Sequence, residues 1–384
     1  MSGDKTFGQD VQFLKQHVDA IVLKDESGKA QVAVVAEYQG RVMTSSAAGE
    51  DGTSFGWINY ERVASDQVTP HINVFGGEER FWLGPEGGQF SIFFPPGAPF
   101  EFDDWKTPAV IDTEPFDVVE KSDRKASFRK ETTLENYSKT KLRLRIDRSV
   151  ELISATDAAS SLGVELGNLA FVGYRTNNTV TNTGKEPWTK QSGLLSIWLL
   201  GMYKPGPQTT VVIPFNVGPE EKLGPIVNDT YFGKVPAERL KVADGVIYFS
   251  GDGQYRSKIG LTPQRAQDVC GSYDALRNVV TIVKYNKPGP EVTDYVNSMW
   301  ELQEKPFAGD VVNAYNDGPP EPGAKPMGPF YELETSSPAL ALAPGESGVH
   351  VQETYHVQGD KAELDRVARE VFGVSLEEIA SALK

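Results

Sequence analysis

Short segments in which apolar and polar residues alternate occur along most of the chain, separated by glycine, proline, asparagine or aspartate. Alternation with a period of two is typical of β-strands. It predicts strands at 20–24, 30–37, 40–45, 126–131, 141–146, 164–166, 176–182, 209–214 and 245–250. Because helical patterns do not alternate with these segments, we expect an all-β fold built from antiparallel sheets.

Helical periodicity is confined largely to the two ends of the chain. Apolar residues fall on one helical stripe within residues 1–18 and on another within 361–384, where Gly373 interrupts the pattern. Ser375 followed by Glu378 is typical of the capping box that begins a helix. We therefore expect an N-terminal helix and C-terminal helices that pack on the β-structure.

The chain has enough apolar material for a large core. It contains 384 residues, of which 39% are hydrophobic, including 19 Phe, 14 Tyr and 6 Trp. No low-complexity linker divides it, and the proline pairs at 95–96 and 319–320 are typical of loops. The sequence therefore predicts a single domain over 1–384.

The charge balance limits the partners of the protein. The formal net charge is −15 and no basic cluster is present, so nucleic acid and anionic membrane surfaces would be repelled. No apolar run approaches the length of a transmembrane helix. We expect a cytoplasmic protein from the sequence as it stands, or a periplasmic one if an export signal has been removed. The oligomeric state stays open.

Few residues offer metal or cofactor chemistry. Cys270 is the single cysteine, and no dinucleotide fingerprint, phosphate-binding loop or serine nucleophile elbow occurs. His350 and His356 share one face of an expected strand, but no further ligand follows at a suitable spacing. We expect no cofactor and no metal.

An acidic pair near the C-terminus is the first candidate for chemistry. The run FYELETSSPA at 330–339 places Glu332 and Glu334 on one face of a strand, with Tyr331 on the other face. Two carboxylates on one face are costly inside a fold unless they are neutralised or used. The alternative is a solvent-facing acidic pair on an edge strand.

A glycine-rich segment is the second candidate. The run VFGGEERFWLGPEGGQ at 74–89 surrounds Arg80 and Trp82 with glycines that allow close approach of a ligand. Arg80 offers a fork of donors and Trp82 a flat apolar face, a combination that suits sugars. The alternative is a tight turn with Trp82 in the core and Arg80 paired to Glu78 or Glu86.

Together with APGE at 343–346 and QETYHV at 352–357, these two runs resemble the galactose mutarotase family, which includes the aldose 1-epimerases. The likeness is strongest to uncharacterised members of that superfamily. It implies an antiparallel β-supersandwich with a sugar site, a mono- or oligosaccharide as partner, and Glu334 as the catalytic base.

Two family histidines are absent from the sequence. Phe75 stands where aldose epimerases carry a histidine before the paired glycines, and no His-x-Phe-Asn strand follows Thr181–Gly184. The resemblance therefore leaves the general acid to His71 or Glu86, with Arg80 orienting hydroxyl groups.

The remaining predicted substrate-binding residues are Trp82, Lys258, Asn316, Asp317 and Tyr331. Asn316 and Asp317 precede Gly318, and this run is also ordinary turn chemistry. The function expected is acid/base chemistry near the anomeric carbon of a sugar, either isomerisation or β-elimination by a lyase. The alternative is a non-catalytic carbohydrate-binding protein that has lost the histidines.

Overall fold

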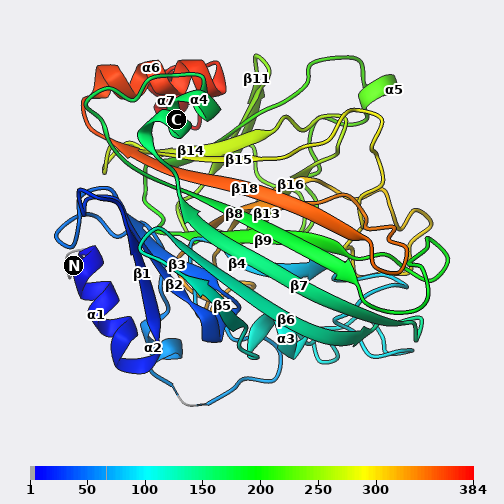
Figure 1. Ribbon diagram of the computed structural model, residues 1–384. Coiled ribbons are helices and arrows are strands. Elements are labelled where there is room, and N and C mark those ends of the chain that lie inside the picture. Colours follow the sequence, from blue (N-terminus) through cyan, green and yellow to red (C-terminus); the bar gives the residue numbers. More distant parts are fainter. Residues whose placement is uncertain (1–4, 66) are drawn as a thin grey trace.

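The computed structural model describes residues 5–65 and 67–384, and strands dominate this part of the chain (Figure 1). They form three sheets in which neighbouring strands run antiparallel. The three-stranded sheet contains β1 (Ala20–Lys24), β2 (Gln31–Val35) and β3 (Arg41–Ser46). The five-stranded sheet has the order β13 (Ser257–Leu261), β16 (Val312–Asn316), β17 (Tyr331–Ser336), β9 (Ser196–Tyr203) and β4 (Arg80–Gly84).

The ten-stranded sheet draws its strands from most of the chain. Its order is β11 (Leu240–Ala243), β12 (Val246–Ser250), β10 (Thr209–Pro214), β14 (Val269–Asp274), β15 (Val279–Tyr285), β18 (Ser347–Gln358), β8 (Ala170–Asn182), β7 (Lys141–Leu152), β6 (Lys125–Glu135) and β5 (Asp117–Lys121). The all-β, antiparallel prediction is confirmed, while one domain over 1–384 stays a prediction.

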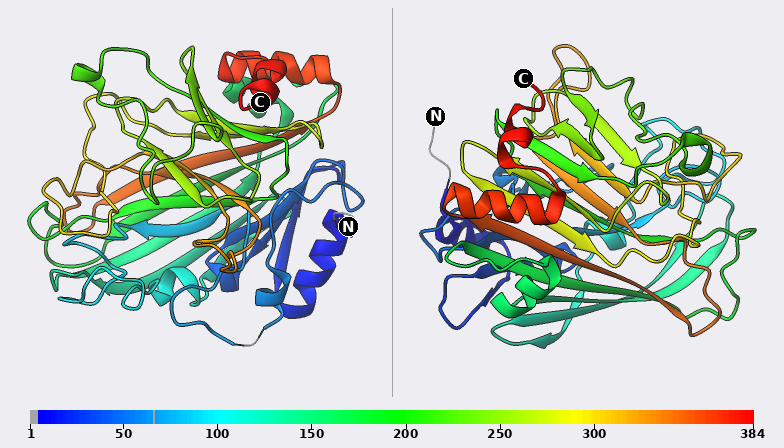
Figure 2. Two further views of the ribbon diagram at one scale, coloured as in Figure 1. Left: turned by 180° about the vertical axis from the view of Figure 1, so that it is seen from behind. Right: turned by 90° about the horizontal axis from the view of Figure 1, so that it is seen from above.

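Helices flank the sheets (Figure 2). The longer ones are α1 (Phe7–His17), which packs on β1 and β3, and α4 (Ala155–Leu162), α6 (Lys361–Phe372) and α7 (Leu376–Ser381), which share an apolar cluster with the ten-stranded sheet. The short ones are η1 (Ala36–Tyr38), α2 (Tyr60–Val63), α3 (Ala109–Asp112) and α5 (Glu220–Leu223). Within the described residues, no helix has both the length and the apolar character needed to cross a membrane.

The predicted terminal helices are present, with the expected signals. Gly373 ends α6 in the left-handed region at φ 76°, and Ser375 and Glu378 form the capping box of α7. The helix α4, which Ser154 caps, was not predicted. Its alanine- and serine-rich sequence shows only a short apolar stripe.

The predicted strand at 164–166 is wrong. The segment is a turn between Gly163 and Gly167, which adopt φ values of 70° and 57°. Val164 and Leu166 are nevertheless buried, in the cluster under α4 and α6. Their alternation therefore reflects packing in an irregular segment. The predicted strand at 30–37 also ends earlier, because the chain turns into η1 after Val35.

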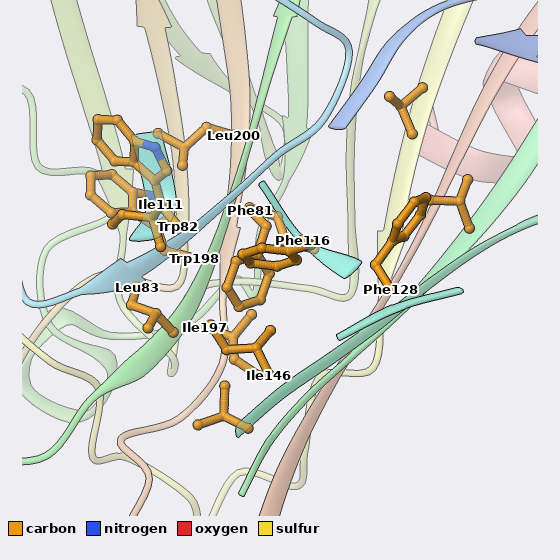
Figure 3. Packing of buried hydrophobic residues seen from close by; sticks show 14 of the residues in the cluster. Phe81, Trp82, Leu83, Ile111, Phe116, Phe128, Ile146, Ile197, Trp198 and Leu200 are labelled. Atoms are coloured by element: carbon orange, nitrogen blue, oxygen red, sulfur yellow. The ribbon is translucent and has the colours of Figure 1, made fainter. Parts of the chain in front are cut away.

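The five-stranded sheet has two different faces. Its inner face packs against the ten-stranded sheet in an apolar core, and its outer face points away from that sheet. Figure 3 shows Phe81 and Ile197 near Ile146 of the ten-stranded sheet, whereas Trp82 and Trp198 lie together apart from them. This division follows from strand alternation, because successive side chains point to opposite faces. The outer face is thereby free to carry a site.

A buried charge network also lies between the sheets. Arg148 on β7 pairs with Glu79 at 2.8 Å, and neither side chain is exposed. Gln352 on β18 donates a second hydrogen bond to Glu79 at 2.8 Å, and the Nε–H of Arg148 donates to the carbonyl of Gly40 at 3.0 Å. These contacts hold the segment before β4 in a fixed position against the large sheet.

Breaking this pair is expected to cost far more than breaking an exposed one. Arg148→Met leaves the Glu79 carboxylate buried without its cation, and a loss of about 3–5 kcal/mol in the free energy of unfolding is expected. The control is Arg129→Met, since Arg129 pairs with Asp147 on the surface and should cost less than about 1 kcal/mol. Urea unfolding measures both, and equal losses would contradict the importance of burial.

Candidate active site

The outer face of the five-stranded sheet carries two rows of side chains across its strands. Strand register places Lys258, Tyr315, Glu332 and Met202 in one row. The second row contains Gly260, Asn313, Glu334, Leu200 and Arg80. The two glutamates share a face of β17, as predicted, and β17 is the central strand rather than an edge.

The glutamates are neutralised by cations from opposite sides of the sheet. Arg80 on β4 reaches Glu332 at 2.5 Å, and Lys258 on β13 reaches Glu334 at 2.9 Å. Each cation lies two strands away from β17, in the row of the other glutamate, so the two ion pairs run diagonally. Charge compensation on both sides allows two carboxylates to remain side by side in a buried sheet.

Glu334 keeps one oxygen free of protein partners. Its Oε2 accepts hydrogen bonds from the Lys258 ammonium and from the Trp198 indole N–H at 3.0 Å. Its Oε1 is buried and has no partner among the described residues. Three other buried polar atoms also have no partner among the described residues: the Nε of Arg80, the indole N–H of Trp82 and the hydroxyl of Ser196. A buried polar atom without a partner is costly, so these four atoms mark a surface suited to a polar ligand.

A cavity of about 1140 Å³ opens over this face. Arg80, Trp82, Ser196 and Glu332 line it. Glu334 does not, but it pairs in register with two lining residues, Asn313 and Leu200. The aromatic part of the lining consists of Trp82, Trp105, Trp198, Trp300, Tyr231, Tyr315, Phe102 and Phe232. Such a lining offers flat apolar faces beside the charged floor.

Glu86 is a titratable wall residue close to the acidic pair. Its backbone N–H donates to the Ser298 hydroxyl at 3.1 Å. Burial and, to a smaller extent, the charge of Glu334 raise the pKa of Glu86 to about 7, against the opposing effect of Lys258. Burial likewise raises the pKa of Glu332 to about 7, against the effect of Arg80. Glu86 is thus partly protonated at neutral pH, and it lies in the lining of the cavity.

A second acidic centre lies on the opposite wall. The Tyr231 hydroxyl donates to Asp310 at 2.5 Å and accepts a hydrogen bond from the Asn313 amide at 3.2 Å. Burial raises the pKa of Asp310.

Asp317 accepts hydrogen bonds from the Tyr315 hydroxyl and from the backbone N–H of Gly328, both at 2.9 Å. Asp317 thereby fixes the end of the long loop between β16 and β17.

The structure brings together most of the predicted site residues. Arg80, Trp82, Glu86, Lys258 and Asp317 line the cavity. Glu334 lies below them with its Lys258 partner. The alternative pairing of Arg80 with Glu78 or Glu86 is not present, because Arg80 pairs with Glu332 across the sheet.

Besides Glu334, three predicted residues are absent from the cavity lining. His71 contacts the carbonyl of Trp105 through Nδ1 at 2.6 Å and stacks on Phe102. Asn316 donates to the carbonyl of Tyr255 at 2.9 Å, and Tyr331 contacts the Ser272 hydroxyl at 2.8 Å. Asn316 and Tyr331 pair with each other in the register of β16 and β17, so alternation turns both side chains to the inner face.

The two histidines of β18 take part in the inner network. His350 contacts the Thr335 hydroxyl at 2.8 Å, and burial lowers the pKa of His350 to about 3. His356 contacts Glu78 at 3.0 Å. Both therefore lie behind the five-stranded sheet, away from the cavity floor.

Sequence reasoning missed Trp105, Trp198, Tyr231, Trp300 and Asp310, which line the cavity. Trp198 carried a local signal, because it alternates with Ser196 and Leu200 on one face of β9. The others come from irregular segments, and no local pattern shows where such segments fold.

The sheet arrangement and the outer-face site define a β-supersandwich of the galactose mutarotase type. The fold matches the Slr1438 protein of Synechocystis sp. PCC 6803 with a TM-score of 0.52 and 13% identity, covering 89% of this chain and 96% of that chain. It matches a protein of Escherichia coli K12, provisionally assigned as an aldose 1-epimerase, with a TM-score of 0.50 and 15% identity, covering 88% and 98%. A galactose mutarotase-like protein of Lactobacillus casei gives 0.48 and 12%, covering 88% and 99%.

The chain belongs to the family of unknown function DUF6786, which matches residues 5–383. No curated protein matches the sequence. At these identities the structural likeness establishes the fold alone. The resemblance to the mutarotase superfamily is thereby confirmed, whereas the chemistry has to be argued from the side chains of this chain.

The raised pKa of Glu86 predicts a pH-dependent stability difference. The unfolded chain loses the Glu86 proton near pH 4.5 and the folded chain near pH 7, so stability present below about 4.5 is lost as the pH rises through about 7. Glu86→Gln removes this loss. At about pH 8 the variant is expected to be more stable than the unmodified protein by up to about 3 kcal/mol, with little difference near pH 4.

Urea unfolding across this pH range measures the difference, and Glu301→Gln is the control because Glu301 is an exposed residue of the same cavity. A Glu86→Gln protein that loses stability with pH as steeply as the unmodified protein would contradict the assignment.

Proposed function

We propose that the protein binds a sugar in this cavity and carries out acid/base chemistry near the anomeric carbon. Support comes from one observation above all: the buried Oε1 of Glu334 has no partner among the described residues, Lys258 holds the other oxygen, and the lining residues Asn313 and Leu200 flank Glu334 in the sheet. Glu86 also lines the cavity. A base and a protonated acid beside the same bound ring are the minimum that ring opening requires.

The binding part follows from the surface chemistry of the floor. Trp82 and Trp198 are only 4% and 6% exposed, and their rings meet edge to face at 5.6 Å. Apolar C–H faces of a pyranose pack on such rings. Its hydroxyls can take the unpartnered atoms of Arg80, Ser196 and Glu334. The floor thus offers both kinds of contact at once.

In the proposed ring opening, Glu334 removes the proton of the anomeric hydroxyl while the bond between the anomeric carbon and the ring oxygen breaks. Glu86 gives its proton to the ring oxygen, and an open-chain aldehyde results. Rotation about the next carbon–carbon bond and reversal of the proton transfers close the other anomer. Lys258 steadies the carboxylate through Oε2 and leaves Oε1 for the substrate.

The same groups serve β-elimination if the sugar carries a carbonyl or carboxyl group. Glu334 then takes the proton from the carbon next to that group, and Glu86 protonates the departing oxygen as the double bond forms. The Arg80–Glu332 pair lies in the cavity lining, where the guanidinium can offset charge that builds on the carbonyl oxygen. The products distinguish this branch from isomerisation, because only elimination gives an alkene.

The second candidate is a sugar-binding protein without catalysis. The contact of Lys258 with Glu334 favours it, because the ammonium group at 2.9 Å already serves as an ion-pair partner of the carboxylate that would act as the base. No histidine lines the cavity in the described part of the chain. In that case the polar floor serves affinity and selectivity alone.

Glu334→Gln separates the two candidates. The change keeps size and hydrogen bonding but removes the base, so turnover is expected to fall by about a thousandfold or more while affinity changes by less than about tenfold. Proton NMR of freshly dissolved aldoses, uronic acids and keto sugars follows anomeric equilibration and alkene signals. Glu370→Gln is the control and should retain turnover, because Glu370 is an exposed residue of α6 outside the cavity lining.

Line broadening of a sugar without conversion by the unmodified protein would support the binding candidate. Conversion that persists in Glu334→Gln would rule out Glu334 as the base. If no sugar in the panel shows binding or conversion, the proposed function is wrong for these sugar classes.

A further inference from the structure

The mouth of the cavity carries three exposed apolar side chains. Phe102, Phe232 and Met327 are 59%, 47% and 44% exposed, and all three line the cavity. They come from three separate connections, between β4 and α3, between α5 and β11, and between β16 and β17. Scattered apolar residues on a surface need no explanation, but a group of them around one opening indicates a contact site.

Neighbouring side chains hold this apolar rim in place. The Arg256 guanidinium lies 3.9 Å from the centre of the Phe232 ring, and Tyr315 meets the same ring edge to face at 6.0 Å. The Asp317 carboxylate binds the backbone of Gly328, the residue after Met327. A rim ordered before binding loses little conformational freedom when a ligand arrives.

The rim differs in chemistry from the floor. The lining residues Arg80, Trp82 and Ser196 have polar atoms without a partner among the described residues, whereas the three rim side chains present carbon and one thioether. The cavity volume of about 1140 Å³ also exceeds the range of about 300–1,000 Å³ usual for a small-ligand site. A single pyranose on the floor would leave the rim uncovered.

We propose that the ligand is a sugar carrying an aromatic substituent, with the sugar on the floor and the aromatic group against Phe102, Phe232 and Met327. This assignment rests on the proposed function for the sugar half. Flat rings fit because Phe102 and Phe232 can pack against them face to face or edge to face. A second sugar could place only its C–H groups against these three side chains, and its hydroxyl groups would find no partner on them.

Paired probes test the assignment by isothermal titration calorimetry. Phenyl and methyl β-D-glucopyranosides and galactopyranosides form one set, and 6-O-benzyl and 6-O-methyl derivatives of glucose and galactose form the other. In at least one pair the aromatic member is expected to bind about tenfold tighter. In the Phe232→Ala and Met327→Ala variants, the gain in affinity of the aromatic member over the methyl member is expected to fall below about threefold. The affinity for the methyl member itself should not change.

Leu276→Ala is the matched control, because Leu276 is 59% exposed and lies outside the cavity lining. It should keep the full gain. Circular dichroism and thermal unfolding of each variant confirm that a lost gain does not come from lost folding.

Several results would overturn the assignment. Equal affinity for the aromatic and methyl members of every pair would show that the rim does not recognise an aromatic substituent. Sugar binding, and with it the proposed function, would not be affected by that result. Lactose or cellobiose binding more tightly than every aromatic probe would assign the rim to a second sugar. A dimer in sedimentation that Phe232→Ala dissociates would assign it to a second copy of this chain. Absence of binding by every probe would overturn both the assignment and the proposed sugar site.

Discussion

Two carboxylates on one face of the central strand β17 set the constraint on which the rest of the site depends. Glu332 and Glu334 stay buried because Arg80 and Lys258 approach them from opposite edges of the five-stranded sheet. A slip of one residue in β17 would separate both pairs and turn both glutamates to the inner face. A slip of β4 or β13 would separate the one pair whose cation that strand carries. The ion pairs therefore require this strand register, and the register is stabilised by the ion pairs. Both together determine the geometry of the cavity floor.

Burial then divides the acidic residues by environment. The Trp198 indole and the Lys258 ammonium hold one oxygen of Glu334, whereas Glu86 faces aromatic walls with weaker compensation. Desolvation consequently raises the pKa of Glu86 to about 7. Neighbouring carboxyl groups in unlike surroundings are a common origin of acid and base roles in one site. In the mechanism that we propose, a second glutamate takes the place of the imidazole that the mutarotase resemblance would supply.

The fold and the charged floor were predictable from the sequence to the extent that they depend on strand alternation. That pattern gave the antiparallel β-structure and placed Glu332 and Glu334 on one face, and the glycine-rich run drew attention to Arg80 and Trp82. It did not give the partners of the carboxylates, because Arg80 and Glu332 are 252 residues apart in the chain. Trp105, Tyr231 and Asp310 lie in irregular segments whose positions depend on packing. His71 also lies in an irregular segment; it is not a lining residue, and its ring stacks on Phe102, which is one.

The inner face of β17 explains why the floor can be rigid. Thr335 contacts both His350 and Gln352, and Gln352 donates to Glu79, the partner of Arg148. Glu79 and Arg80 are consecutive, so alternation sends one side chain into the inner network and the other into the cavity. A displacement of Arg80 would therefore have to disturb a buried ion pair on the other side of its own backbone. The inner network thus resists movement of the outer ion pair, and the site is preorganised by contacts that a ligand never touches.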